Sequence, residues 1–182
     1  MKKLISILTA LVMLVAFAIA EETPESASPA GISELAVEGG KLIGAYYHCS
    51  GDEYGNIFSA GIDWAEDDPL VLTVQERVSR GDPLTISKYR AESDSLTRIA
   101  AIVNEHHMVS WCEREDVIMV CDAAYPQLCL VIEMDDGGIV NVAISGYIEL
   151  TDEEEEAWKA VKEIILEGKS GELIETYQIE DE

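Results

Sequence analysis

The sequence predicts an α+β domain with one antiparallel sheet of about six strands and two helices on one face of that sheet. Several short segments alternate apolar and polar residues, which is typical of strands with one buried face. Two other segments repeat their apolar residues every three to four positions, as amphipathic helices do. Their order along the chain is βββαβββα, and strands joined by short turns favour antiparallel pairing.

The first 20 residues have the layout of a secretory signal peptide. A basic start, Met1-Lys2-Lys3, precedes an apolar run that ends in Ala18-Ile19-Ala20, a small-x-small cleavage site. We expect residues 1–20 to be removed and the protein to be secreted or extracytoplasmic, with no stable membrane insertion after cleavage. The alternative is an uncleaved anchor, because the apolar run is at the short limit for a membrane span.

The chain after this leader divides into three parts. Residues 21–40 contain two prolines and few large apolar side chains, so we expect a flexible linker. Residues 41–168 form the single α+β domain, which is long enough to bury a core. Residues 169–182 form an acidic C-terminal tail.

Four segments in the first half of the domain are predicted to be extended. Residues 42–49 and 57–64 are rich in the aromatic and β-branched residues that strands favour, and residues 70–75 alternate apolar and polar side chains. After a break at Gly81-Asp82-Pro83, residues 85–88 form a short extended piece.

The first helix follows Ser93 or Asp94, because either side chain can accept a hydrogen bond from the first turn. Its apolar positions follow the helical period and end near His107-Met108. The predicted buried stripe is Leu96, Ile99, Ala100, Val103 and His107.

The last helix begins at Thr151 and ends at Gly168. Thr151 and Glu154 have the spacing of a capping box, in which each side chain bonds the backbone amide of the other residue. Its predicted buried residues are Ala157, Trp158, Val161, Ile164 and Ile165.

Three apolar strands are predicted between the helices, over residues 117–121, 128–134 and 139–148. The apolar faces of the last two strands meet if Met134 lies opposite Val140. Asp136-Gly137-Gly138 is then a three-residue loop with glycine at the left-handed position.

Four cysteines remain after the leader is removed, and an even number in an exported chain suggests disulfide bonds. A hairpin that places Val120 opposite Leu130 also brings Cys121 opposite Cys129, close to disulfide distance. Cys49 and Cys112 are the remaining pair. The alternative is four reduced thiols that pack as small apolar groups.

The charge balance excludes whole classes of partner. The chain has 36 Asp and Glu against 12 Lys and Arg, a net charge of −24. Nucleic-acid binding requires a basic surface, and anionic lipid surfaces repel such a chain. We expect the acidity to keep the protein soluble outside the cell.

Candidate reactive groups are few. His107 with Cys112 is the one thiol–imidazole combination, with His106 beside it. His48, Cys49, His106, His107 and Cys112 include zinc-type ligands, and the acidic segments 63–68 and 135–136 offer oxygen ligands for calcium, but neither set has the spacing of a known site. We therefore expect no metal and no cofactor.

Two local enrichments have simple structural explanations. Five basic residues fall within residues 77–98, and we expect them to pair with acids of the same domain, the alternative being a docking patch for an acidic ligand or wall polymer. They are Arg77, Arg80, Lys88, Arg90 and Arg98.

Aromatic residues are concentrated in the first hairpin. Strand propensity explains this enrichment, and the alternative is an aromatic sheet face that binds peptide or sugar. They are Tyr46, Tyr47, Tyr54, Phe58 and Trp64.

The chain resembles uncharacterised secreted or lipid-anchored domains of Gram-positive bacteria over roughly residues 41–167. The matching features are Tyr46-Tyr47-His48-Cys49-Ser50-Gly51, the helix end His107-Met108 with Trp111 after it, and Asp136-Gly137. The resemblance implies no particular activity and no site residues. It also implies a lipid-attachment cysteine after the leader, which this chain lacks.

These observations favour an exported, non-catalytic domain that binds an extracellular protein, a peptide or a cell-wall component. The chain has no nucleophile elbow, phosphate loop or dinucleotide fingerprint. The alternative is a secreted hydrolase that uses a carboxylate pair or Cys112 with His107.

Overall fold

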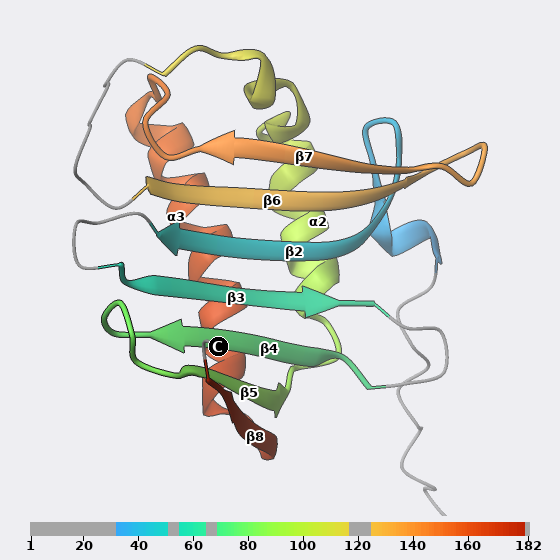
Figure 1. The fold of residues 1–182 in the computed structure, drawn as a ribbon. Coiled ribbons are helices and arrows are strands. Elements are labelled where there is room, and N and C mark those ends of the chain that lie inside the picture. Colours follow the sequence, from blue (N-terminus) through green and yellow to red (C-terminus); the bar gives the residue numbers. More distant parts are fainter. Residues whose placement is uncertain (1–31, 51–54, 65–68, 117–124, 181–182) are drawn as a thin grey trace, which may run out of the picture.

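A computed structural model describes residues 32–50, 55–64, 69–116 and 125–180. In this part of the chain, eight strands form one antiparallel sheet in the order β7-β6-β2-β3-β4-β5-β8, and β1 pairs with the start of β2. Helices α2 (Ser95–Glu105) and α3 (Asp152–Glu167) lie side by side behind the sheet (Figure 1). The molecule therefore has two layers, with its core between them.

The remaining elements are short. The strands are β1 (Ala36–Val37), β2 (Gly40–Ser50), β3 (Ile57–Asp63), β4 (Val71–Arg77), β5 (Leu84–Arg90), β6 (Tyr125–Met134), β7 (Ile139–Ser145) and β8 (Leu173–Ile179). The 3-10 helices are η1 (Ile32–Leu35), η2 (Met108–Glu113) and η3 (Gly168–Ser170).

The α+β class and the antiparallel sheet are confirmed, but the number and order of the strands differ from the expectation of six strands in the order βββαβββα. Five described strands precede α2, two lie between the helices and one follows α3. The segment predicted as the strand 117–121 lies outside the described residues. Two additional strands, β1 and β8, come from the ends of the domain, where the sequence predicted a linker and a tail, and β5 includes the short extended piece predicted over residues 85–88.

The N-terminal addition consists of η1 and β1. Leu35 is 1% exposed and Val37 is 9% exposed, and both belong to the core. Asn104 of α2 donates a side-chain hydrogen bond to the backbone oxygen of Ala36 at 2.7 Å. The folded domain therefore begins before Lys41, because these two apolar residues are buried by it.

The C-terminal addition is β8, which the sequence assigned to an acidic tail. Acidic residues in and just before β8 pair with basic residues of β5: Lys88 pairs with Glu175 at 2.9 Å, and Arg90 pairs with Glu172, which directly precedes β8, at 3.2 Å. Opposite charges on directly paired strands favour this addition. All residues of β8 are exposed, so the strand extends the sheet and does not extend the core.

The core lies between the helices and one face of the sheet. Alternate residues of the central strands point toward the helices and are fully buried, as expected for a sheet covered on one side. The largest of these buried side chains in the sheet are Leu42, Ile62, Leu72, Leu128, Leu130, Ile132 and Ile144. Trp111 and Met108 of η2 close one end of the core and are at most 1% exposed.

The hairpin between β6 and β7 has the predicted faces but a different register. Ile132 lies opposite Val140, whereas the prediction placed Met134 there. The backbone amide of Gly137 bonds to the oxygen of Met134 at 2.9 Å, and Gly137 has a φ of +82°. The left-handed residue of the turn is thus Gly137, so the loop starts one residue earlier than predicted.

The two helices begin differently. The capping box of α3 is confirmed: the amide of Glu154 bonds to the Thr151 hydroxyl at 3.3 Å, and the amide of Thr151 bonds to Glu154 Oε2 at 2.9 Å. Asp94 is the N-cap of α2, but its side chain makes no capping hydrogen bond. The expectation of a side-chain cap on the first helix is therefore wrong.

The predicted stripe of α2 is buried from Leu96 to Val103 but not at its last position. His107 lies beyond the helix with a φ of +51° and an exposed side chain. The left-handed residue turns the chain into η2, which points Met108 inward in place of His107. Burial of His107 was therefore predicted wrongly, because the helical period ends two residues earlier.

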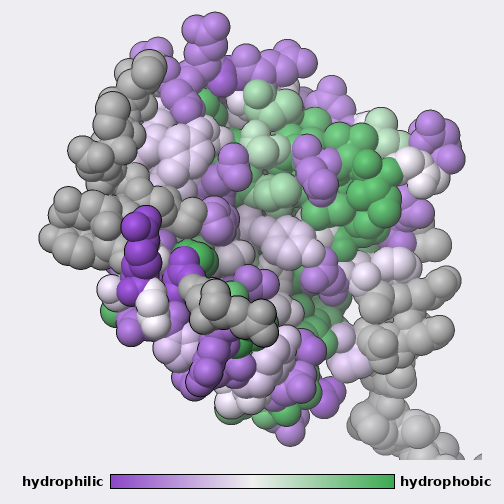
Figure 2. Space-filling view, in the orientation of Figure 1, coloured by the Kyte–Doolittle hydropathy of each residue, from purple (hydrophilic) through white to green (hydrophobic). Residues whose placement is uncertain are grey.

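The sheet face away from the helices is open to solvent. Figure 2 shows this face as mostly polar, with apolar side chains gathered over the ends of β2, β6 and β7 near the hairpin turn. Ile139, at the start of β7, is 65% exposed.

Candidate functional site

The proposed thiol–imidazole combination is not assembled. The Cys112 thiol donates a hydrogen bond to the backbone oxygen of Val109 at 3.2 Å, and it lines a small cavity beside η2 that His107 does not line. The backbone oxygen of His107 accepts from the Ser110 hydroxyl at 2.9 Å. Among the described residues, no hydrogen bond joins the His107 ring to the Cys112 thiol, so this geometry offers no activated nucleophile.

The cysteines are separated in the described structure. Cys49, Cys112 and Cys129 have free thiols, and Cys49 and Cys112 line different cavities. Cys129 lies between Tyr46 and Ala143 on its two neighbouring strands. Cys121 itself lies outside the described residues, and a disulfide at that position stays a prediction.

The candidate metal ligands are also dispersed. Over the residues that the structure describes, no group of three or more His, Cys, Asp or Glu side chains is close enough to hold a metal ion. His48 and Cys49 are on β2, whereas His106, His107 and Cys112 lie around the end of α2. Of the acidic segment 63–68, residues 65–68 fall outside the described part.

Three of the five basic residues of segment 77–98 pair with acidic side chains of the domain, as the sequence predicted; they are Lys88, Arg90 and Arg98. Besides the two ion pairs between β5 and β8, Arg98 of α2 contacts Glu167 at 2.9 Å. Arg77 donates to the backbone oxygen of Gly55 at 3.4 Å. These four side chains stabilise contacts within the domain, whereas Arg80 is exposed.

The aromatic residues of the first hairpin are divided between the two faces of the sheet. Tyr46 lies on the open face, where its ring covers Gly61 and its hydroxyl donates to Asp63. Burial, followed by the hydrogen bond to Asp63, raises the pKa of Tyr46. Tyr47 and Phe58 lie on the helix side with ring centroids 5.9 Å apart, so no continuous aromatic face forms among the described residues.

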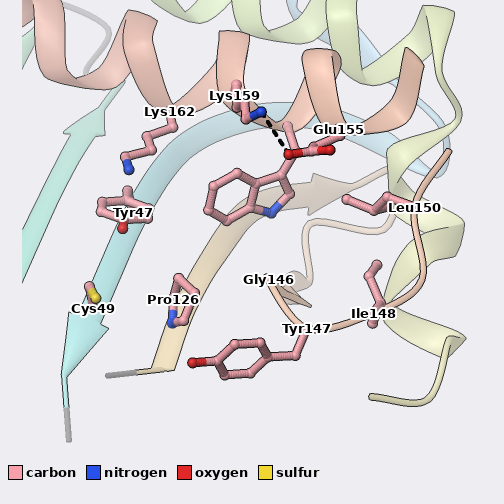
Figure 3. Close-up of a pocket in the computed structure, with 11 residues that line it drawn as sticks. Tyr47, Cys49, Pro126, Gly146, Tyr147, Ile148, Leu150, Glu155, Lys159 and Lys162 are labelled. Atoms are coloured by element: carbon pink, nitrogen blue, oxygen red, sulfur yellow. Dashed lines mark ion pairs between the residues drawn. The ribbon is translucent and has the colours of Figure 1, made fainter. Parts of the chain in front are cut away.

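A cleft of about 460 Å³ lies between α3 and the adjacent ends of β2 and β6 (Figure 3). This volume is in the range of small-molecule and peptide side-chain sites. Three regions of the chain line it: one face of α3, the strand ends, and the segment that connects β7 to α3. Its lining residues are Tyr47, Cys49, Pro126, Gly146, Tyr147, Ile148, Leu150, Glu155, Trp158, Lys159 and Lys162.

The helical wall of the cleft follows from the spacing of α3. Glu155, Trp158, Lys159 and Lys162 stand at i, i+3, i+4 and i+7, which places them on one face of the helix. The capping box fixes where this helix begins and therefore which residues face the cleft.

The opposite wall combines strand ends with a tight turn. The backbone amide of Gly146 bonds to the oxygen of Pro126 at 2.8 Å, and a Cβ at Gly146 would approach Pro126 Cγ to 2.8 Å. Glycine therefore allows the connection after β7 to pack directly on β6. Ile148, Leu150 and the Tyr147 ring continue this wall.

Tyr47 joins the two walls. Its ring packs edge-on against the Trp158 indole with centroids 5.8 Å apart, and Lys162 Nζ lies 4.5 Å from the same Tyr47 centroid. Burial, followed by the charge and the hydrogen bond of the neighbouring Cys49 thiol, raises the pKa of Tyr47 to about 12. The phenol is therefore neutral over the physiological range, and its ring holds the lysine and the indole in place.

Trp158 has an unusual polar atom. Its side chain is 9% exposed, and the indole Nε1 is buried without a hydrogen-bond partner among the described residues. A buried donor without an acceptor costs about 1–3 kcal/mol.

The comparisons with known proteins do not assign the site. The chain matches no protein-family model, and neither the curated proteins nor the solved structures include a significant match. In the part of the chain that the structure describes, no helix is both long and apolar enough to cross a membrane.

Sequence reasoning placed Trp158 in the core and did not select the two lysines. A usable signal was present: Lys159 and Lys162 are the only basic residues of α3, and both follow a tryptophan on an otherwise acidic helix. That pattern indicates a helix face that combines an aromatic ring with basic side chains, unlike the acidic face that is exposed to solvent. The missing information was the position of Tyr47 and Pro126, which reach the cleft from distant segments.

Proposed function

We propose that the protein is an exported, non-catalytic domain that binds a ligand in the cleft between α3 and the ends of β2 and β6. The observation that carries the proposal is a cleft of about 460 Å³ that has the Tyr47 and Trp158 rings and the Lys162 ammonium on its walls. A peptide or a cell-wall component is the expected class of ligand. Export is proposed from the N-terminal leader.

The three tryptophans allow a direct test of binding. In ¹⁵N-labelled protein each indole N–H produces its own resonance, and Trp158→Phe identifies the resonance of Trp158. Titration with a fragment set of neutral, cationic and anionic compounds should shift the Trp158 resonance, because a ligand in the cleft changes the magnetic environment of the indole that lines it. Trp64 and Trp111 line no part of the cleft and are internal controls.

The outcome is decisive for the cleft. If no fragment moves the Trp158 resonance, or if shifts occur only at Trp64 or Trp111, the proposed function is wrong. Export has a separate test: the protein from the culture medium or envelope should begin at Glu21, and an intact Met1 on cytoplasmic protein would contradict it.

A further inference from the structure

The two edges of the sheet differ in charge. Among the described strands, the sheet ends at β7 on one side and at β8 on the other (Figure 1). Charged side chains and prolines usually protect such edges from pairing with another chain. Strand β8 contains Glu175 and lies between Glu172 and Glu180. The segment from Ile139 to Ile148, which includes β7, has no charged residue and no proline, so β7 is the unprotected edge.

Alternate residues of β7 direct their backbone groups away from β6. The oxygen of Gly138 accepts from the amide of Met134 at 2.7 Å, and the amide of Gly146 donates to the oxygen of Pro126 at 2.8 Å. Bonded pairs alternate along antiparallel strands, so the even-numbered residues bond to β6 and the odd-numbered residues point outward. Among the described strands β7 pairs only with β6, so the outward groups are open to a further strand. The exposed outward residues are Ile139, Asn141 and Ala143.

A groove of about 270 Å³, the η2 groove, adjoins this edge between η2 and the hairpin of β6 and β7. Its lining includes two carboxylates, Glu38 and Glu113, and no basic residue. Neither carboxylate forms an ion pair with a described side chain. The apolar lining residues are Val109, Ile132, Met134, Val140 and Val142.

We propose that β7 binds an extended segment of a basic polypeptide, added antiparallel along residues 139–143 with lysine or arginine side chains in the η2 groove. Long basic side chains suit this groove because their aliphatic stems pack on apolar residues while the charged ends reach Glu38 and Glu113. The alternate residues of the segment face the open side of the sheet. There Ile139 is 65% exposed, and Figure 2 shows apolar side chains gathered at this end.

A second copy of the chain fits this edge less well. Pairing of two β7 strands brings together two sets of the groove carboxylates, and each chain has a net charge of −24. Like charges oppose such a contact, whereas the same charges attract a basic segment. The acidity of the chain therefore disfavours self-pairing at an edge that its own side chains do not protect.

Amide hydrogen exchange along β7 tests the addition of a strand, with acetyl-Lys-Val-Lys-Val-Lys-amide as the probe and ¹⁵N-labelled protein. The amides of Ile139, Asn141 and Ala143 should exchange at least about tenfold more slowly with saturating peptide, because each gains a backbone acceptor. The amides of Val140 and Val142 already bond to β6 and are the internal reference. Equal slowing at odd and even positions, or no slowing, would overturn the proposal.

The charge of the partner is tested with acetyl-Glu-Val-Glu-Val-Glu-amide, which has the same length and alternation. The lysine peptide should bind at least about tenfold more tightly, and added salt should reduce this preference. Glu38→Gln and Glu113→Gln should each weaken the lysine peptide about two- to fivefold. Glu163→Gln, an exposed position of α3 outside the groove, is the matched control and should have no effect.

Two results would overturn the basic partner. The first is equal affinity for the lysine and glutamate peptides. The second is a loss in Glu163→Gln as large as the losses in Glu38→Gln and Glu113→Gln.

The backbone bonds are tested from both sides. Asn141→Pro removes one outward N–H at an edge position that tolerates proline, and it should abolish binding, whereas Asn141→Ala should retain it. In an antiparallel addition the valines of the peptide direct their N–H groups to β7. A peptide N-methylated at both valines should therefore not bind, and this arm remains decisive where Asn141→Pro is unstable. Full binding of that peptide would overturn the proposal.

Two observations separate this edge from its alternatives. Slower exchange of the same amides without peptide, as the protein concentration rises, would assign the edge to a second copy and overturn the basic partner. No residue lines both the η2 groove and the cleft of the proposed function, so the lysine peptide should leave the Trp158 indole resonance in place. A peptide that shifts this resonance without slowing exchange along β7 binds in the cleft and overturns the inference.

Discussion

Helices α2 and α3 pack side by side on the same face of the sheet, yet they have different roles (Figure 1). The buried residues of α2 all face the core, and its N-cap makes no side-chain hydrogen bond. Helix α3 has an equally buried core stripe, a complete capping box and, beside them, a second face that lines the cleft. The first helix completes the core, whereas the second also positions the candidate site.

The difference teaches how a site is recognised on an amphipathic helix. Both helices show the same periodicity, so burial alone does not separate them. Trp158 of α3 is as deeply packed as many core residues, but its Nε1 has no partner among the described residues, and charged side chains of the same helix line the cleft with it. These two features distinguish this helix face from a core face.

The largest expected loss of stability concerns the buried core stripe, which both helices have. Ile99 of α2 and Ile165 of α3 are both 0% exposed. Replacing either with alanine should lower the free energy of unfolding by about 2–4 kcal/mol, because buried methylene groups are lost and a cavity remains. Urea denaturation of both variants measures the effect. Glu105→Ala and Glu163→Ala, at exposed positions, are the controls, and a loss below about 1 kcal/mol at Ile99 or Ile165 would contradict the shared core role.

We expect an intermediate loss of stability when Glu154, at the start of α3, is replaced. Helix α2 has no equivalent capping carboxylate bond. Hydrogen bonds from Arg114, followed by the backbone amide of Thr151, lower the pKa of Glu154 to about 2 from an ordinary value of 4.5. The stabilisation by this carboxylate is therefore complete above pH 4.5 and is lost as the pH falls toward 2. Glu154→Gln should destabilise the protein at neutral pH, less than the core variants do.

The difference in urea midpoint between wild type and Glu154→Gln should shrink as the pH is lowered. Glu155→Gln is the matched control, since Glu155 is adjacent but pairs only with exposed Lys159. A difference that stays constant from pH 5 to about 2 would show that the ionised carboxylate is not the source of the stabilisation.

The smallest effect concerns the two N-caps. Thr151→Ala removes a hydrogen bond to the first turn of α3 and should cost about 1 kcal/mol of unfolding free energy. Asp94→Ala should cost clearly less, because the Asp94 side chain makes no capping hydrogen bond in α2. Thermal or urea unfolding of the two variants compares them directly, and equal losses would mean that α2 is capped by its side chain in solution.

Local features were predicted well because they depend on neighbouring residues. The capping box at Thr151 and the end of α3 at Gly168 are set by residues within one or two helical turns. The strands β2, β3, β4 and β6 match alternating segments, and the buried faces of β6 and β7 were correct. His107 was misplaced because one left-handed residue ends a helical period without a sequence signal.

Pairing between distant segments was not predictable in the same way. The register of β6 on β7 differs by two residues from the prediction, and a shift of two keeps every side chain on the same face. The apolar pattern is therefore equally satisfied by both registers, and the position of the left-handed glycine decides between them. The pairing of β5 with β8, which holds acidic and basic side chains together, lies beyond any local pattern.

The sequence by itself determined the α+β class, the two amphipathic helices, the faces of the strands and the acidic character of the chain, because these follow from periodicity and composition. Only the tertiary structure decided the strand order and the cleft. Tyr47, Pro126 and Trp158 come from three separate parts of the chain, and whether an indole N–H finds a partner depends on all three. Hydrogen-bond satisfaction is a property of the assembled surroundings, which no single segment contains.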